Sequence, residues 1–357
     1  MAELNSGIGA HTIAEILSEP ATWTACLQRV EQTAELQSLN ESLPKGIEWV
    51  FVGCGSSFYL AQSAAASWSI LTGKRARAIP ASEIMFFAET LPVPCQPVLI
   101  SRSGNTSEVI RTAEYFEREL NIRTLAITCG TNTALQKISS HTIRLPDADE
   151  KSTVMTRSFT SMLLVLQSLA AIRGNQRDFL NGVRQLAEQV GAGLNEIHAA
   201  VKSLVHGNSF ADYVFLGQGP FFGIAQESML KVKEMSCSYA QSFHTLEFRH
   251  GPKAIVSPET LITFILSDSG FDAEIAVLEE IKQLGGKTLV ITNTANAAVR
   301  RSADFLFELS LAMPETARAA ASVIPSQMLG FYTGLKKGLN PDEPRNLSRV
   351  VMLESGK

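Results

Sequence analysis

The sequence predicts an α/β protein with two tandem, doubly wound domains, each a three-layer arrangement of a parallel sheet between helices. Three observations predict this fold. Segments of the first half recur in the second half, short apolar runs alternate with longer segments of helical spacing, and 357 residues suit two domains of about 100–200 residues each.

The internal repeat carries the prediction of two domains. Three segments recur in the same order: Trp49–Gly55 as Tyr213–Gly219, Ile100–Gly104 as Leu266–Gly270, and Arg123–Thr128 as Lys287–Thr292. The offsets are 213 − 49 = 164, 266 − 100 = 166 and 287 − 123 = 164 residues. Solenoid repeats are about 20–50 residues long, so this spacing indicates a duplicated domain.

Within the first copy the pattern is that of a parallel sheet. Trp49–Val52, Val98–Ile100 and Thr124–Thr128 are continuous β-rich runs, as expected for strands buried on both faces. Between the second and third runs, four apolar residues fall on one face of a predicted helix: Val109, Ala113, Phe116 and Leu120. We place the domains at residues 25–175 and 195–338, an N-terminal arm at 1–24 and a C-terminal tail at 339–357.

Composition excludes several classes of partner. Lys and Arg number 31 against 35 Asp and Glu, so the sequence lacks the basic footprint of a nucleic-acid-binding protein. Apolar runs such as Leu261–Leu266 are far shorter than the roughly 18 residues of a membrane span, and no secretory signal is visible. Five cysteines without ligand spacing favour reduced thiols and a cytoplasmic location.

Two loops of the first copy are candidate phosphate sites, because ligands of parallel sheets bind at the carboxyl ends of the strands. Gly53–Ser57 follows a strand and opens an alanine-rich helix, so its serine hydroxyls, Ser56 and Ser57 among them, lie beside free helix N–H groups. The alternative is a strand-to-helix turn with serine caps.

The second loop, Ser101–Glu108, is richer in polar groups. It contains one arginine and four hydroxyls, of which helix capping explains only one. Neither loop has the spacing of a P-loop or of a dinucleotide-binding motif. In the second copy, Gly217–Phe221 replaces the serines with proline and phenylalanine, and Ser267–Ser269 contains an acid that would repel phosphate. We therefore expect one phosphate site per chain.

The second copy carries a different constellation. Glu227, Lys231 and Glu234 are spaced i, i+4 and i+7, so they form one stripe of a helix. The alternative is a solvated salt-bridge ladder worth a few tenths of a kcal/mol. Buried together, these groups would shift one another's pKa values, as proton transfer requires. His250 precedes Gly-Pro, and a histidine on a rigid turn suits acid/base chemistry, although most single histidines are structural.

These motifs resemble those of the tandem SIS (sugar isomerase) family, with its flavodoxin-like sheets. The resemblance is to the isomerase half of glutamine–fructose-6-phosphate aminotransferases and to free-standing glucosamine- and galactosamine-6-phosphate deaminases. It covers almost the entire chain and is carried by four motifs in order: Cys54–Ser57, Ser101–Thr106, Glu227–Glu234 and Phe248–Pro252.

The resemblance implies a role for each candidate residue. Six residues would hold the sugar phosphate: Ser56, Ser57, Ser101, Arg102, Ser103 and Thr106. Glu234 would move a proton between C1 and C2, with Glu227 and Lys231 supporting it, and Glu150 would contact the sugar. His250 would open the sugar ring from a neighbouring subunit, which implies a homodimer with shared active sites. The tail would close over the active site.

The sequence departs from the aminotransferases in three ways. Arg102 replaces a glutamine, and Arg349 replaces the lysine that contacts the open-chain ketose; arginine does not readily form a Schiff base. The first strand begins near residue 48, so we expect no glutaminase domain.

The expected function is therefore conversion of an amino-sugar 6-phosphate to a ketose 6-phosphate and ammonia, with no metal or organic cofactor. A deglycase acting on fructosamine 6-phosphates and a non-catalytic sugar-phosphate sensor remain as alternatives. The sequence fixes neither the sugar epimer nor the direction of reaction.

Overall fold

The computed structural model describes residues 7–353, so the ends of the predicted arm and tail, 1–6 and 354–357, lie outside the described residues. The chain forms two compact units. The first-copy unit contains residues 21–150, 157–184 and 348–353, and the second-copy unit contains residues 7–20, 151–156 and 185–347.

The first-copy unit is built on a five-stranded sheet in the order β2-β1-β3-β4-β5. Its strands are β1 (Glu48–Gly53), β2 (Ala76–Pro80), β3 (Cys95–Ile100), β4 (Leu125–Thr128) and β5 (His141–Arg144). All neighbouring pairs are parallel. The chain winds one way from β1 to β2 and the other way from β3 onward, so a ligand crevice is expected between β1 and β3.

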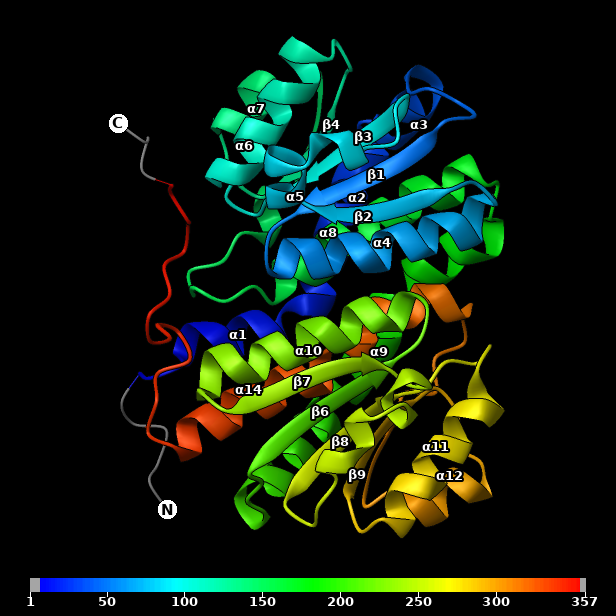
Figure 1. Ribbon diagram of the computed structural model, residues 1–357, viewed down its shortest axis with the longest axis vertical. Helices are drawn as coiled ribbons and strands as arrows, with labels where there is room; N and C mark the ends of the chain where they lie inside the picture. The colour runs from blue at the N-terminus through cyan, green and yellow to red at the C-terminus, as the bar shows by residue number, and fades with distance from the viewer. Residues whose placement is uncertain (1–6, 354–357) are drawn as a thin grey trace. The chain divides into compact units, whose positions relative to one another are not determined.

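Helices cover both faces of this sheet (Figure 1). They are α2 (Glu19–Gln32), α3 (Glu35–Ser42), α4 (Ser56–Thr72), α5 (Ala81–Phe86), α6 (Ser107–Glu114), α7 (Ala134–Ile138) and α8 (Arg157–Arg173). Val50 and Val52 of β1 pack toward α5, α6 and α7, whereas Trp49 stacks on Trp68 of α4, with ring centroids 3.6 Å apart. Alternate side chains of each strand thus pack into two apolar layers, one on each face of the sheet.

The predicted stripe on α6 is confirmed for three of its four members. Val109, Ala113 and Phe116 are fully buried, whereas Leu120 is only half-buried. The helix continues through one π turn, Tyr115–Glu119, which displaces the last apolar residue from the regular helical spacing.

The second-copy unit repeats this architecture. Its sheet has the order β10-β9-β8-β6-β7, with strands β6 (Asp212–Gly217), β7 (Tyr239–His244), β8 (Thr260–Ile265), β9 (Lys287–Thr292) and β10 (Phe305–Glu308), all pairs parallel. Its helices are α1 (Ala10–Leu17), α10 (Pro220–Ser236), α11 (Phe271–Gln283), α12 (Ala297–Ser302), α13 (Ala319–Ser322) and α14 (Ile324–Lys336). The long helix α9 (Arg177–Gly207) has residues in both units.

The duplication extends to backbone angles. Helices α4 and α10 are both 17 residues long, and each begins after a glycine in the same conformation: φ 54°, ψ −127° at Gly55 and φ 53°, ψ −127° at Gly219. A Cβ on Gly53 would lie 2.5 Å from backbone atoms of Ser57, and one on Gly217 would lie 2.4 Å from the carbonyl of Phe221. Glycine is therefore required at both strand ends. The prediction of two doubly wound α/β domains is confirmed.

Among the described residues, no helix has the length and apolar character needed to cross a membrane.

Candidate functional site

The loop after β1 brings two predicted phosphate ligands to the switch point of the first sheet. Ser56 and Ser57 are the first two residues of α4, and both are buried. Gly55, with positive φ, turns the chain into the helix, and the N–H groups of Ser57 and Phe58 donate to the carbonyls of Cys54 and Gly55 at 3.1 and 2.9 Å.

The loop after β3 places its hydroxyls close together. The Ser101 and Thr106 hydroxyls lie 3.1 Å apart, and Ser101 also accepts from the N–H of Gly104 at 3.1 Å. Ser103 accepts from the N–H of Asn105 at 3.1 Å. Although Thr106 precedes α6, its side chain makes no capping bond, so capping does not account for this residue.

Two contacts fix this loop to the next strand-to-helix connection. The carbonyl of Arg102 accepts from the Thr128 hydroxyl and from the N–H groups of Cys129 and Gly130, each at 3.0 Å. Gly104 has φ 64°, and a Cβ there would lie 2.4 Å from the Thr133 hydroxyl oxygen. The loop is therefore held in one conformation by backbone bonds and by close packing.

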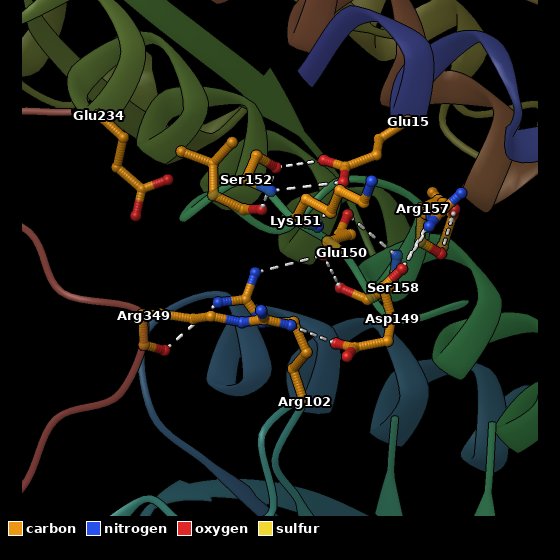
Figure 2. Close-up of polar contacts among 12 residues, drawn as sticks. Glu15, Arg102, Asp149, Glu150, Lys151, Ser152, Arg157, Ser158, Glu234 and Arg349 are labelled. Carbon is orange, nitrogen blue, oxygen red and sulfur yellow. Dashed lines mark hydrogen bonds and ion pairs between the residues drawn. The ribbon is translucent and has the colours of Figure 1, made fainter. Parts of the chain in front are cut away.

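Arg102 and Glu150 form a buried ion pair in the same unit (Figure 2). Their nearest nitrogen and oxygen lie 3.3 Å apart, and their side chains are 5% and 0% exposed. The backbone N–H and the hydroxyl of Ser158 also donate to the Glu150 carboxylate. Breaking such a pair leaves a buried charge uncompensated, so Arg102 and Glu150 depend on each other.

The C-terminal tail contacts the same loop. A guanidinium nitrogen of Arg102 donates to the carbonyl of Arg349 at 3.3 Å, and the Arg349 side chain forms an exposed ion pair with Asp149 at 2.6 Å. The N–H of Ser107, the first residue of α6, donates to the Val351 carbonyl at 3.4 Å. The tail thus lies against the N-terminus of α6.

In the second-copy unit, α10 buries the predicted charged stripe. The Lys231 ammonium lies 3.2 Å from Glu227 and 2.5 Å from Glu234. Lys231 and Glu227 are fully buried, and the Glu234 side chain is 18% exposed. Burial disfavours the charged lysine, but the two carboxylates outweigh it, so the pKa of Lys231 is raised above its ordinary value. The solvated-ladder alternative is therefore wrong.

His250 lies at the end of a short 3-10 turn, Glu247–Arg249, where its N–H donates to the Glu247 carbonyl at 3.0 Å. Its side chain is exposed, and the following Gly251 has φ 114°. The His250 side chain is therefore accessible to solvent and is carried by a constrained turn.

The sequence analysis did not identify two acids that hold residues 151–153 in the second-copy unit. The Glu15 carboxylate of α1 accepts from the N–H groups of Lys151 and Ser152 and from the Ser152 hydroxyl (Figure 2). The N–H of Thr153 donates to the carbonyl of Asp342 at 3.0 Å. Glu15 acts through its carboxylate and Asp342 through its backbone carbonyl, and both are more than 130 residues away in sequence, so no spacing rule could find them.

The structure thus gathers the predicted residues in two groups, each described within its own unit. The first-copy unit holds Ser56, Ser57, Ser101, Arg102, Ser103, Thr106, Glu150 and Arg349. The second-copy unit holds Glu227, Lys231, Glu234 and His250.

Both sheets and their loops match a known family. The model of the SIS domain matches residues 48–172 and again residues 212–333, which together are more than half of the chain. The chain belongs to the SIS domain family. The two SIS domains correspond to the two copies of the repeat, and the resemblance inferred from the sequence is confirmed.

Curated relatives include glutamine–fructose-6-phosphate aminotransferases. That of Methanothermobacter thermautotrophicus is 24% identical over 365 residues, which cover 99% of this chain and 59% of the relative. That of Rhizobium meliloti is 28% identical over 288 residues, which cover 77% of this chain and 47% of the relative. The SIS chain therefore spans about half of the length of these relatives.

Solved structures of similar length also match. Glucosamine-6-phosphate deaminase of Thermotoga maritima has a TM-score of 0.78 and 27% identity, covering 96% of this chain and 99% of that one. Tagatose-6-phosphate ketose/aldose isomerase of Escherichia coli has a TM-score of 0.82 and 23% identity, covering 93% and 94%. The second likeness supports the tandem SIS fold alone.

Proposed function

We propose that this protein is a phosphosugar isomerase and deaminase that converts an amino-sugar 6-phosphate to a ketose 6-phosphate and ammonia. The observation that carries the proposal is the buried stripe of α10, where Glu234 reaches solvent while its charged partners do not. The likeness to a glucosamine-6-phosphate deaminase over nearly the whole of both chains supports the substrate class.

The stripe suits proton transfer next to a carbonyl. Lys231 fixes the orientation of the Glu234 carboxylate from one side, and Glu227 balances the lysine from the other. The exposed edge of Glu234 is the edge that a substrate reaches. A fixed carboxylate of this kind takes a proton from a carbon and returns it to the neighbouring carbon.

The reaction follows in three steps. His250 gives a proton to the ring oxygen while water takes the proton of the C1 hydroxyl, and the ring opens to the aldehyde. Glu234 removes the proton from C2 and delivers it to C1, while the C1 oxygen gains a proton and the amine loses one, which turns the 2-amino aldose into the ketose imine. Water then adds to C2 and ammonia leaves, which gives the ketose 6-phosphate. No net oxidation or reduction occurs.

Phosphate binding is assigned to the first-copy unit. The hydroxyls of Ser57, Ser101, Ser103 and Thr106 are supplied by two loops at the switch point of one sheet, which favours an anion there. We assign Arg102 a different role from the one expected, because its guanidinium is already paired with Glu150 and with the tail. It orders the tail against the loop.

We further propose a homodimer in which His250 serves the site of the neighbouring subunit. Complementation tests this: mixing inactive His250→Ala with inactive Glu234→Gln subunits should restore part of the activity. An active monomer in sedimentation at assay concentration would contradict it. The five cysteines, none of which is in a disulfide, suit a cytoplasmic enzyme.

The deciding experiment measures ammonia and ketose phosphate released from a panel of amino-sugar 6-phosphates, with a fructosamine 6-phosphate included. Ammonia together with ketose phosphate supports the proposal. Release of a free amino acid from the fructosamine phosphate would make the protein a deglycase instead. Binding without product or exchange of carbon-bound hydrogen in deuterated water would make it a sensor.

A further inference from the structure

The loop that follows β8 in the second copy holds a carboxylate of the chain itself. The N–H of Asp268 donates to one oxygen of Glu315 at 2.5 Å, and the N–H of Ser269 donates to the same oxygen at 3.2 Å. The Ser269 hydroxyl donates to the other oxygen at 2.7 Å. Three donors of one short loop therefore converge on one anion, as they do in anion-binding loops.

This loop is the repeat counterpart of the loop after β3. In both loops a serine hydroxyl accepts from the N–H of the glycine three residues later, at 3.1 Å for Ser101 and Gly104 and at 2.9 Å for Ser267 and Gly270. The turn stands one residue farther from its strand in the second copy, because Leu266 follows β8 before the serine.

Matching the two turns by this bond gives an offset of 267 − 101 = 166 residues. It pairs Arg102 with Asp268 and Ser103 with Ser269. Ser269, which binds Glu315 through both its N–H and its hydroxyl, therefore stands at the position of Ser103, to which a phosphate contact of the first copy is assigned. In the second copy the anion that these donors bind is a side chain of the same unit.

The remaining charges explain why the carboxylate is tolerated. Arg318, whose side chain is 4% exposed, forms an ion pair with Asp268 and so compensates the negative charge of the loop's own acid. Glu274 accepts from the N–H and hydroxyl of Ser267, both at 2.7 Å. Burial raises the pKa of Glu274, which makes this acid easier to neutralise.

We propose that the loop after β8 is a second binding site for a phosphate-class oxyanion, kept filled by the carboxylate of Glu315. Glu315 begins a short turn, Glu315–Arg318, that leads directly into α13. The filled loop thus fixes the path from the last strand of the sheet to the helices behind it. This site is independent of the proposed reaction, because none of its residues is assigned to catalysis or substrate binding.

Removing the carboxylate tests the proposal. In a Ser103→Ala/Thr106→Ala background, which weakens the first loop, Glu315→Ala should bind inorganic phosphate at least tenfold more tightly than its parent in calorimetry. Asp268→Asn added to Glu315→Ala should tighten binding further, because Arg318 then loses its carboxylate partner. Glu259→Ala removes an exposed acid elsewhere in the unit and should change nothing.

The outcomes separate cleanly. Phosphate binding gained with Glu315→Ala but not with Glu259→Ala, together with amide shifts at Asp268 and Ser269 on titration, supports the site. Folded Glu315→Ala and Asp268→Asn/Glu315→Ala proteins that bind phosphate no better than the parent overturn it. If the alanine variant is destabilised, phosphate should raise its melting temperature and leave that of the parent unchanged; equal shifts would also overturn the proposal.

Discussion

In the first copy, the loop after β3 groups the hydroxyls of Ser101 and Thr106, whereas the matching loop of the second copy binds Glu315 through its own N–H groups. The helices that follow the first strand of each copy, α4 and α10, also differ, but here it is the second copy that carries the proposed functional side chains. On α10, Glu227, Lys231 and Glu234 form a buried charged stripe.

The positions 164 residues earlier on α4 are neutral. They are Ser63 (227 − 164), Ser67 (231 − 164) and Ile70 (234 − 164). Ser63 and Ser67 are buried and Ile70 is 58% exposed. On the proposed assignment, the first copy supplies the substrate-phosphate contacts and the second copy supplies the acid/base groups. Shared backbone geometry constrains the glycines, while the side chains around them are free to diverge.

The largest effect is expected at Glu234. Glu234→Gln keeps the shape of the side chain but removes the base, so turnover should fall by about 10²–10⁴-fold while substrate affinity survives. Exchange of the C1 or C2 hydrogen with deuterated water, followed by NMR, measures the step directly. Ile70→Gln changes the counterpart on α4 and should leave turnover unchanged. Undiminished exchange in Glu234→Gln would show that another group transfers the proton, and Glu227 would be the first candidate.

Lys231 should dominate the stability of the second copy. Lys231→Met leaves Glu227 buried without its cation and should cost about 3–5 kcal/mol of unfolding free energy, measured in urea. Glu227→Gln/Lys231→Met removes both buried charges and should recover much of that loss, since Glu234 reaches solvent. A double variant no more stable than the single one would show that packing, and not charge, holds this helix.

The glycines at the strand ends should behave alike in both copies. Gly53→Ala and Gly217→Ala each force a Cβ to within 2.5 Å of helix backbone, and each should cost about 1–3 kcal/mol. Gly193→Ala is the matched control, because its Cβ would meet no atom within 4 Å and helix propensity favours alanine. Unequal costs at Gly53 and Gly217 would argue against a shared backbone constraint.

The smallest effect is expected at the hydroxyls of the first loop. Ser103→Ala and Thr106→Ala should each weaken binding of a hexose 6-phosphate by about 1–2 kcal/mol, the scale of one hydrogen bond to a charged group. The weaker binding should appear as a higher KM, and the free energy of unfolding should change little. Ser269→Ala, the counterpart of Ser103→Ala, should leave KM unaltered. Wild-type affinity in the Ser103→Ala/Thr106→Ala protein would move the phosphate elsewhere.

The repeat, the central strands and the stripe of α10 could all be predicted from the sequence, because each can be recognised from the pattern of residue types within a short segment. Trp49–Val52 in β1, Val98–Ile100 in β3 and Leu125–Ile127 in β4 are apolar without interruption, which is the pattern of strands covered on both faces. The edge strands escaped prediction. β2 and β7 are largely half-exposed. β2 contains Arg77 and ends in a proline, and β7 contains Gln241, Ser242 and His244, so neither resembles a buried strand.

Only the tertiary structure decided the partners of the charged loop residues. The sequence predicts that Arg102 is a phosphate ligand, yet in the structure it pairs with Glu150, 48 residues away, and with the tail, 247 residues away. Glu315 belongs to no motif, yet its carboxylate is bound by the loop after β8. Helical and strand periodicity report contacts within one element, whereas the position of a buried charge depends on which distant donors the completed fold brings to it.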